Sequence, residues 1–284
     1  MLKFKNPTAE IFVPDGVPLP DALRRVTHLG IGAHQDDLEF MAFHGIACCH
    51  RDESQWFGGV TCTNGGGSSR AGAYANVTDV EMRAIRRREQ NEAARIGRYG
   101  VMIQLDYSSA TVKSSKDTAL REDLIAVLDA ANPRVVYTHN LADKHESHIG
   151  VAVAAIEAMR ALPQGRRPEA VYGCEVWRGL DWMPDDEKII HDVSGHESLA
   201  DALCAVFDSQ IAGGKRYDLG VAGRRRANAT FLETHAADRT ESAALAMNLT
   251  PLISDESLNI AAFVDDCIGR FRNDVQAKLR RRLG

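Results

Sequence analysis

Short apolar runs alternate with stretches of helical periodicity along the first 195 residues, and this alternation constrains the fold more than any other feature. The runs expected to form strands are residues 26–33, 56–62, 101–107, 134–140 and 170–176, and the helical stretches are residues 37–50, 78–98, 118–131 and 148–162. Uninterrupted apolar runs are typical of parallel strands that are buried on both faces. The order therefore predicts an α/β fold, with a doubly wound (Rossmann-like), mostly parallel sheet and helices on both faces.

The alternation loosens beyond residue 176. The remaining expected elements are a strand at 188–193 and helices at 196–211 and 257–282, and residues 213–234 are left without an assignment. We therefore expect a core over residues 1–195 that contains the functional site. Residues 196–284 are expected to form a helical or irregular extension that packs on this core, within a single domain overall.

Two polar clusters follow two of the expected strands. Ala33-His34-Gln35-Asp36-Asp37 follows the run at 26–33, and His145-Glu146-Ser147-His148 follows the run at 134–140. In a doubly wound sheet, the first and fourth strands lie side by side where the strand order reverses, and ligands bind at the carboxyl ends of the strands there. The order of the elements therefore predicts that the two clusters face each other across one crevice.

The residue types in these clusters fit a hydrolytic zinc site, which usually has three protein ligands. His34 and Asp37 are three residues apart at a strand-to-helix turn, and His145 and His148 share that spacing at the start of a helix. If two histidines and one carboxylate bind the metal, the remaining histidine can act in acid–base catalysis or stabilise an oxyanion. Asp36 can then accept a proton from water. Each motif alone is more commonly a capping carboxylate or an ordinary pair of helix histidines. The metal interpretation depends on the combination.

Composition and charge exclude several classes of protein. A formal charge of −5 argues against a general nucleic-acid binder. Residues 1–20 have the pattern of neither a signal peptide nor a membrane span. Six cysteines occur without a C-x-x-C pair, so we expect reduced thiols and a cytoplasmic protein with no membrane partner.

Together with two further motifs, the clusters resemble the signature of the PIG-L/LmbE-like zinc N-deacetylases. That signature consists of A-H-P-D-D, a T-D-G loop, an R-x-x-E helix and H-x-D-H. The corresponding residues here are Ala33-His34-Gln35-Asp36-Asp37, Thr63-Asn64-Gly65, Arg86-Arg87-Arg88-Glu89 and His145-Glu146-Ser147-His148. The resemblance extends over roughly residues 26–195, with the motifs in order and at plausible spacing.

The resemblance implies that His34, Asp37 and His148 bind one zinc ion, or another divalent transition metal. It also implies that Asp36 is the general base and that His145 stabilises the oxyanion or acts as an acid. The implied substrate is a small N-acetylated amino sugar or an N-acetylglucosaminyl conjugate. A homo-oligomer is implied as well.

Three departures from the family pattern concern the turn and the substrate. Gln35 replaces the usual proline, which we expect to loosen the turn. Asn64 replaces the aspartate of the loop, which puts a charge-based substrate contact there in question. Ser147 replaces the aspartate before the last ligand, and either Asp143 or Glu146 could orient a histidine in its place.

Several alternatives stay open from the sequence alone. Arg86 either holds a substrate group or belongs to a solvated arginine run, and Asp143 either supports the site or caps a loop. Trp177, Trp182 and the segment near Arg225 either border the site or simply pack. The function is an N-deacetylase, a zinc amidase for a larger acyl group, or a metal- or sugar-binding protein without catalysis. The presence of Asp36 and His145, which binding alone does not require, favours an enzyme.

Overall fold

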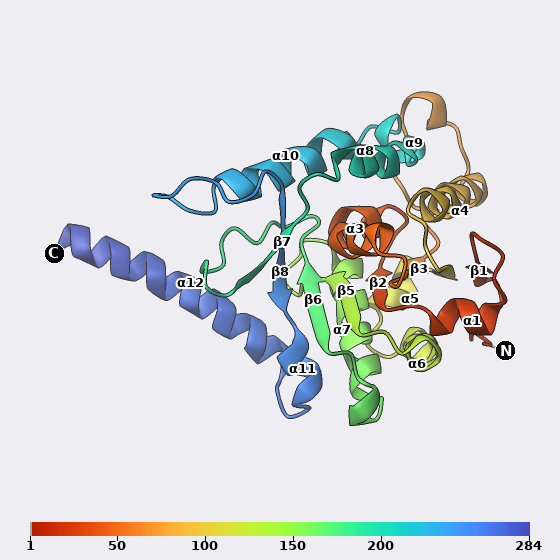
Figure 1. The fold of residues 1–284 in the computed structure, drawn as a ribbon, viewed down its shortest axis with the longest axis horizontal. Coiled ribbons are helices and arrows are strands. Elements are labelled where there is room, and N and C mark those ends of the chain that lie inside the picture. The colour runs from red at the N-terminus through yellow and green to blue at the C-terminus, as the bar shows by residue number, and fades with distance from the viewer. Residues whose placement is uncertain (1) are drawn as a thin grey trace.

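A computed structural model describes residues 2–284 as a mixed eight-stranded sheet with helices on both faces (Figure 1). The strands lie in the order β1-β4-β3-β2-β5-β6-β8-β7. They comprise β1 (Glu10–Phe12), β2 (His28–Gly32), β3 (Phe57–Thr63), β4 (Val101–Tyr107), β5 (Val135–His139), β6 (Ala170–Cys174), β7 (Lys188–Asp192) and β8 (Ala243–Asn248). The α/β fold with a mostly parallel sheet, predicted from the alternation of elements, is confirmed.

The strand order reverses at β2. This strand pairs in parallel with β3 on one side and with β5 on the other. From β2 the chain proceeds outward through β3 to β4, and it then returns to the opposite side of β2 to form β5. The two expected strands that precede the polar clusters are therefore neighbours, as predicted, and their carboxyl ends meet at one edge of the sheet.

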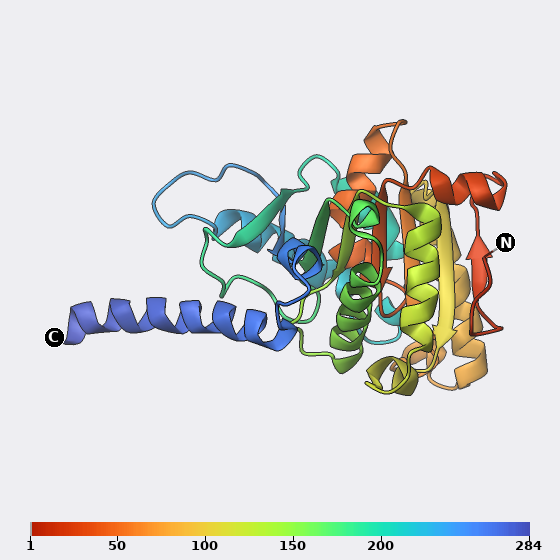
Figure 2. The same ribbon diagram turned by 90° about the horizontal axis from the view of Figure 1, so that it is seen from below.

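Helices cover the sheet in two layers. The helices are α1 (Leu19–Arg24), α2 (Asp37–Met41), α3 (Phe43–Arg51), α4 (Asp79–Ile96), α5 (Ser109–Lys113), α6 (Ala119–Ala131), α7 (Glu146–Arg160), α8 (Glu197–Ala205), α9 (Asp208–Ile211), α10 (Tyr217–Thr230), α11 (Thr250–Ser254) and α12 (Ile260–Leu283). Short 3-10 turns lie at Gly72–Tyr74 and Gln164–Arg166. One core contains side chains of α6 and α7, and the other contains side chains of α3, α4 and α8 (Figures 1 and 2).

The long helix α4 begins as its sequence predicts. The Thr78 side chain accepts a hydrogen bond from the Glu81 amide at 3.3 Å, and the Glu81 carboxylate accepts one from the Thr78 amide at 2.8 Å. This reciprocal capping box satisfies two backbone donors that a helix start otherwise leaves free. The helix ends before Gly97, so both of its predicted limits are close to the observed ones.

Two predicted helices are divided in the structure. The helix expected at 37–50 is interrupted at Ala42, and the helix expected at 196–211 is interrupted before Asp208. The first interruption turns α3 onto the sheet, where Gly45 lies so close to β5 that an added Cβ would be 2.5 Å from the ring of Tyr137. Tertiary packing therefore decides where this helix turns, and helical periodicity does not encode that contact.

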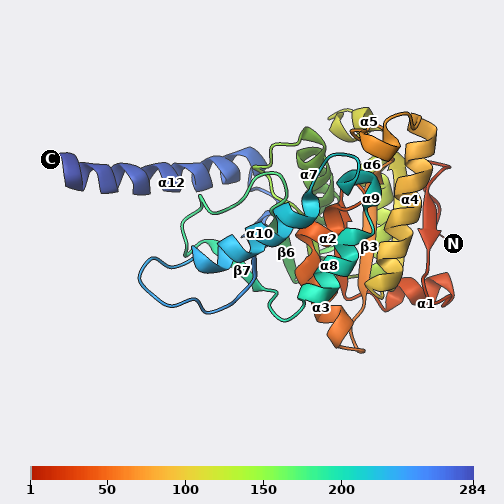
Figure 3. The same cartoon turned by 90° about the horizontal axis from the view of Figure 1, so that it is seen from above.

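Residues after 195 contribute to the sheet itself. Strand β8 lies between β6 and β7 and runs antiparallel to both. This strand was not predicted, because its sequence AALAMN has none of the β-branched or aromatic residues that mark strands. Helix α10 occupies much of the segment that the sequence left unassigned, on the same side of the sheet as α3 (Figure 3). Part of the expected extension is thus built into the core.

The last helix, α12, leaves the body of the molecule. Its first turns contact the core, and its second half extends away from the other elements in all three views (Figures 1–3). Across residues 2–284, no helix combines the length and the apolar character needed to cross a bilayer.

Candidate metal centre

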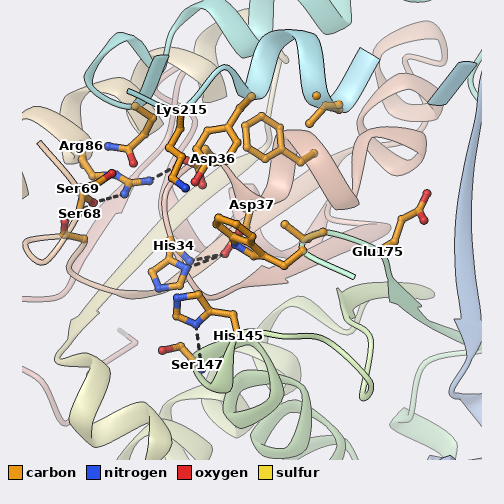
Figure 4. Close-up of a pocket in the computed structure, with 18 of the residues that line it drawn as sticks. His34, Asp36, Asp37, Ser68, Ser69, Arg86, His145, Ser147, Glu175 and Lys215 are labelled. Carbon is orange, nitrogen blue, oxygen red and sulfur yellow. Dashed lines mark hydrogen bonds and ion pairs between the residues drawn. The ribbon is translucent and has the colours of Figure 1, made fainter. Parts of the chain in front are cut away.

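The two polar clusters meet at the carboxyl ends of β2 and β5, as their order in the sequence predicts. His34 lies in the turn between β2 and α2, and His145 is the residue before the first turn of α7. The rings of these two histidines are 4.9 Å apart, in a T-shaped arrangement (Figure 4). Side chains that are more than a hundred residues apart in the chain therefore share one pocket.

Three potential ligand atoms converge at this point. His34 Nδ1 lies 3.2 Å from Asp37 Oδ2 and 3.2 Å from His148 Nε2, and the last two atoms are 3.4 Å apart. A point at the centre of such a triangle lies about 1.9 Å from each corner, close to zinc–nitrogen and zinc–oxygen distances of about 2.0–2.2 Å. A single shared proton cannot pair with the lone pairs of all three atoms at once, whereas one metal cation can bind all three. The geometry fits the donor set proposed from the sequence.

Surrounding side chains hold His148 in place. Asp143 Oδ2 lies 3.5 Å from His148 Nδ1, and the ring of His139 stacks on the His148 ring at 3.8 Å. Asp143 also accepts a hydrogen bond from the His145 amide at 3.1 Å, whereas Glu146 is exposed and approaches Lys113 at 3.9 Å. Of the two carboxylates considered from the sequence, it is Asp143 that lies beside a histidine ring, as a residue that orients a metal ligand would.

His139 offers a second combination of metal-binding groups, with Asp37 and His148. Its Nε2 atom, however, accepts a hydrogen bond from the Ala33 amide at 2.9 Å. That lone pair is therefore engaged, and His34 is the better third ligand. His139 is the last residue of β5, and nothing in the sequence indicated this backbone contact.

The charges of the candidate ligands depend on one another. Burial alone would raise the pKa of Asp37, but His148 and His139 hold this pKa well below its usual range. Burial alone would lower the pKa of His148, yet Asp37 and Asp143 raise it. The Asp37 carboxylate and the His148 ring thus favour each other's charged forms in a buried place, and a bound cation could supply the positive charge there instead.

Asp36 lies beside the ligands in a strained conformation. Its φ is 95°, in the region that residues other than glycine rarely occupy. The carboxylate is buried and receives a hydrogen bond from Arg86 Nη2 at 2.9 Å. Burial raises the pKa of Asp36 well above its usual value, Arg86 opposes that shift, and Asp37 adds to it. Strain and a shifted pKa in one residue are common where a side chain does chemistry.

Arg86 is a buried part of the site and not a member of a solvated run. It donates hydrogen bonds to the Gln35 carbonyl, to Asp36 and to the Ser68 hydroxyl, so it joins the β2–α2 turn to the loop after β3. Glu89, the last residue of the same motif, instead accepts hydrogen bonds from the amide and the hydroxyl of Ser209, at 2.8 and 2.6 Å. The two ends of this motif therefore serve different contacts.

The expectation that Gln35 loosens the turn is wrong. The side chain is buried, and its amide group donates hydrogen bonds to the Thr63 carbonyl at 3.1 Å and to Gln104 Oε1 at 3.2 Å. These contacts tie the turn to β3 and β4. Gly65 allows them, because it has φ 68° and an added Cβ would collide with Gln35 Oε1.

His145 presents a hydrogen-bond donor to the pocket. Its Nδ1 atom accepts a hydrogen bond from the Ser147 amide at 3.3 Å. In the neutral imidazole this places the proton on Nε2. Burial lowers the pKa of His145, and His34 and His148 add to that shift, which favours the neutral form. Ser147 also lines the pocket, and its buried hydroxyl lacks a hydrogen-bond partner among residues 2–284.

The pocket has a volume of about 530 Å³. Its outer wall is formed by aromatic and basic side chains, several of them from the C-terminal part of the chain: Phe40, Trp177, Lys215, Tyr217, Arg224 and Arg225. The Lys215 ammonium lies 5.1 Å from the centre of the Trp177 ring. Lys215 and Tyr217 were not predicted as site residues, because no motif marks the segment that contains them.

Two residues considered from the sequence lie elsewhere. Asn64 is not among the residues that line the pocket, and its side-chain oxygen accepts a hydrogen bond from the Gly66 amide at 3.1 Å. Trp182 packs against Phe271, with ring centres 6.1 Å apart. Trp177, in contrast, does line the pocket.

Comparisons with known proteins agree with this architecture. Residues 29–159 match the family model described as PIG-L: GlcNAc-PI de-N-acetylase. This range contains both polar clusters. A search of curated proteins found no match to the sequence.

Several solved structures share the fold. GalB, the 4-carboxy-2-hydroxymuconate hydratase from Pseudomonas putida KT2440, is 22% identical with a TM-score of 0.61, over 79% of this chain and 96% of that one. The conserved protein TT1542 from Thermus thermophilus is 20% identical with a TM-score of 0.59, over 82% and 99%. The N,N'-diacetylchitobiose deacetylase from Pyrococcus horikoshii is 18% identical with a TM-score of 0.56, over 81% and 87%.

The family match and the shared fold agree with the motifs in the sequence and with the place where the structure brings them together. Over residues 29–159, which contain the two polar clusters, this chain is similar to the PIG-L de-N-acetylases.

Proposed function

We propose that this protein is a zinc-dependent hydrolase that removes the N-acetyl group from a small amino sugar or an N-acetylglucosaminyl conjugate. The observation that carries the proposal is the convergence of His34, Asp37 and His148 beside the buried carboxylate of Asp36. Three ligands with a free acid–base residue next to them are what a hydrolytic metal site requires.

The metal ligands in this proposal are His34 Nδ1, Asp37 Oδ2 and His148 Nε2. When bound there, zinc supplies Lewis acidity, which lowers the pKa of water and polarises a carbonyl oxygen. Asp143 and His139 keep the ring of His148 in the orientation that binding needs.

Asp36 accepts a proton from the water molecule that attacks the acetyl carbon. As the water oxygen bonds to that carbon, the carbonyl oxygen gains negative charge, and the neutral His145 donates a hydrogen bond to it from Nε2. The carbon–nitrogen bond then breaks, and the proton held by Asp36 passes to the departing amine nitrogen. The products are acetic acid and the free amine. Proton transfer from the acid to the amine then gives acetate and the ammonium form, so the atoms and the protons balance.

The outer wall of the pocket supports a sugar substrate. Trp177 and Tyr217 offer flat aromatic surfaces, with ring centres 6.1 Å apart and nearly perpendicular planes. Lys215 extends toward the same space, where it can donate hydrogen bonds to hydroxyl groups (Figure 4). A volume of about 530 Å³ is within the range of small-molecule sites, about 300–1,000 Å³. The chitobiose deacetylase of the same fold, by its name, acts on an N-acetylated sugar.

The first experiment measures acetate release from a panel of N-acetylated sugars and sugar conjugates, with added zinc and again with a chelator. We expect zinc-dependent release from at least one member of the panel. Zinc bound without any release from the panel would contradict the proposal and direct the search to conjugates with larger acyl groups.

The Asp36→Asn variant tests the mechanism. It should retain zinc and lose turnover by about a hundredfold to ten-thousandfold, the usual contribution of a general base. Zinc content is measured by elemental analysis alongside the rate, so that loss of the base is distinguished from loss of the metal. Near-full activity in this variant would refute the role of Asp36.

A further inference from the structure

Helix α12 carries a stripe of apolar side chains whose second half is not covered by any other part of residues 2–284. Ile268, near the middle of the helix, is 45% exposed, and Val275 and Leu279 in its second half are 37% and 52% exposed. Large apolar side chains in a continuous exposed row mark an interaction surface far more often than scattered single residues do.

The stripe continues the face by which α12 packs on its own body. Val264 and Cys267 contact the core, and Phe271 packs against Trp182. Ile268, Val275 and Leu279 follow on the same side of the helix, at spacings of three or four residues. We call the row from Val264 to Leu279 the α12 stripe. It is a packing face whose second half extends beyond the body that its first half contacts.

The projecting part of α12 lacks the usual source of helix stability. From Arg272 to Leu283 it is about 18 Å long, at about 1.5 Å per residue. Helices of that length are marginal in water, and in proteins most of their stability comes from packing an apolar face. A partner along the α12 stripe would supply the missing packing.

The charges beside the stripe are self-complementary. The tip of α12 carries Arg280, Arg281 and Arg282, which form no ion pair within residues 2–284. The start of the helix carries Asp265 and Asp266, and it lies beside an acidic loop, residues 181–187, that contains four carboxylates. Glu187 of this loop forms an ion pair with Arg270 at 2.5 Å, which fixes the loop against α12.

We infer that the partner is a second copy of this chain, with the two α12 helices packed antiparallel along the uncovered second halves of their stripes. In that arrangement the basic tip of each helix lies against the acidic loop and the acidic start of the other helix. In a dimer with a two-fold axis, both copies contribute the same surface, so that surface must complement itself. When two helices that are acidic at one end and basic at the other pack antiparallel to each other, opposite charges face each other at both ends. A parallel pair would instead place three arginines against three arginines.

The test measures the molar mass of the full chain by sedimentation equilibrium over a range of concentrations. We expect a dimer for the unaltered protein. The double variant Val275→Glu/Leu279→Glu should raise the dimer Kd by about 30-fold or more, because it places charge at the centre of the interface. Its control is Phe231→Glu, which changes an equally apolar side chain, 83% exposed, outside the α12 stripe; this control should leave the Kd unchanged.

Salt dependence tests the orientation. Raising ionic strength from about 0.05 to about 0.5 M should weaken an antiparallel dimer, because it screens the attraction between the basic tips and the acidic loops. The triple variant Arg280→Glu/Arg281→Glu/Arg282→Glu should weaken it in the same way. A dimer that salt strengthens would overturn the antiparallel arrangement.

A monomer at all concentrations would overturn the proposal, as would a dimer that the stripe variant leaves intact. Binding of the basic tip to vesicles with anionic lipid, by a monomeric protein, would assign the tip to an anionic surface and also overturn it. None of these outcomes depends on the enzymatic activity, so the inference stands or fails separately from the proposed function.

Discussion

The carboxylate of Asp36 experiences two opposing influences. Burial and the neighbouring Asp37 favour its neutral form, and the guanidinium of Arg86 favours its ionised form. Only the ionised form can accept a proton from water. Arg86 is therefore a positioning residue that also shifts the proposed base toward its ionised form.

Replacing Arg86 should change the pKa of Asp36 and so test the effect of the guanidinium on it. In Arg86→Met the pKa of Asp36 rises further, so the acidic limb of the pH profile of kcat/KM moves to higher pH, and the rate at pH 7 falls by about 100-fold. The pH profile on an N-acetylated substrate measures both effects. The matched control is Arg88→Met, which changes an exposed arginine of the same run. An acidic limb that stays in place in Arg86→Met would contradict the assignment.

At the scale of single residues, the motifs and the strand order were sufficient to predict that the two polar clusters approach one another. The choice of His148 over His145 as the ligand came only from the family resemblance. The motifs were not sufficient for Arg86, because three consecutive arginines give no sign of which one faces inward. The contacts of Gln35 were also hidden, since they depend on a carbonyl of β3 and a side chain of β4. Local motifs encode ligand type, whereas supporting contacts arise from elements that are distant in sequence.

Between α3 and β7 lies a cluster of aromatic rings that responds to acid. His191 of β7 stacks on His44 of α3 at 4.1 Å and contacts Tyr172 at 4.7 Å. Burial, with a smaller contribution from His44, lowers the pKa of His191 to about 3. The unfolded chain takes up a proton at this residue near pH 6.5, and the folded chain does not do so until about pH 3. The folded state therefore loses stability as the pH falls below about 6.5.

The variant His191→Phe should remove this contribution while keeping an aromatic ring in the cluster. Between pH 7 and pH 5, the unaltered protein should lose about 2 kcal/mol more of its free energy of unfolding than this variant loses. Urea unfolding at the two pH values measures the difference. The control is the exposed His235→Phe. If both variants followed the pH dependence of the unaltered protein, the cluster would not be the acid-sensitive element.

At the scale of elements, the alternation of apolar runs and helical stretches was sufficient to predict the central strands and their order. It did not predict β8, because an alanine-rich strand has no local sequence signature. This strand is stabilised by pairing with β6 on one side and β7 on the other. The division between α2 and α3 was missed for a similar reason, since it follows from the close contact of Gly45 with Tyr137.

For the whole molecule, a bound metal should act as a stabilising ligand. Zinc at about 100 times its Kd should stabilise the folded state by about 2.7 kcal/mol, which raises the Tm. In Asp37→Asn most of this zinc-induced shift should disappear, and in Glu146→Gln, an exposed neighbour of the site, it should remain. Thermal unfolding with zinc and with chelator provides the comparison. A full shift in Asp37→Asn would remove Asp37 from the ligand set.

The place of β8 in the sheet also sets an order of events during synthesis. Within residues 2–284, β7 pairs with β8 alone. Residues 188–192 can therefore join the sheet only after residues 243–248 have been synthesised. All of the candidate metal ligands lie before residue 150, whereas Lys215 and Tyr217 of the pocket wall lie between these two strands. As the chain leaves the ribosome, its N-terminal residues emerge first. The candidate metal ligands are therefore all synthesised before the residues that complete the wall of the pocket and the edge of the sheet.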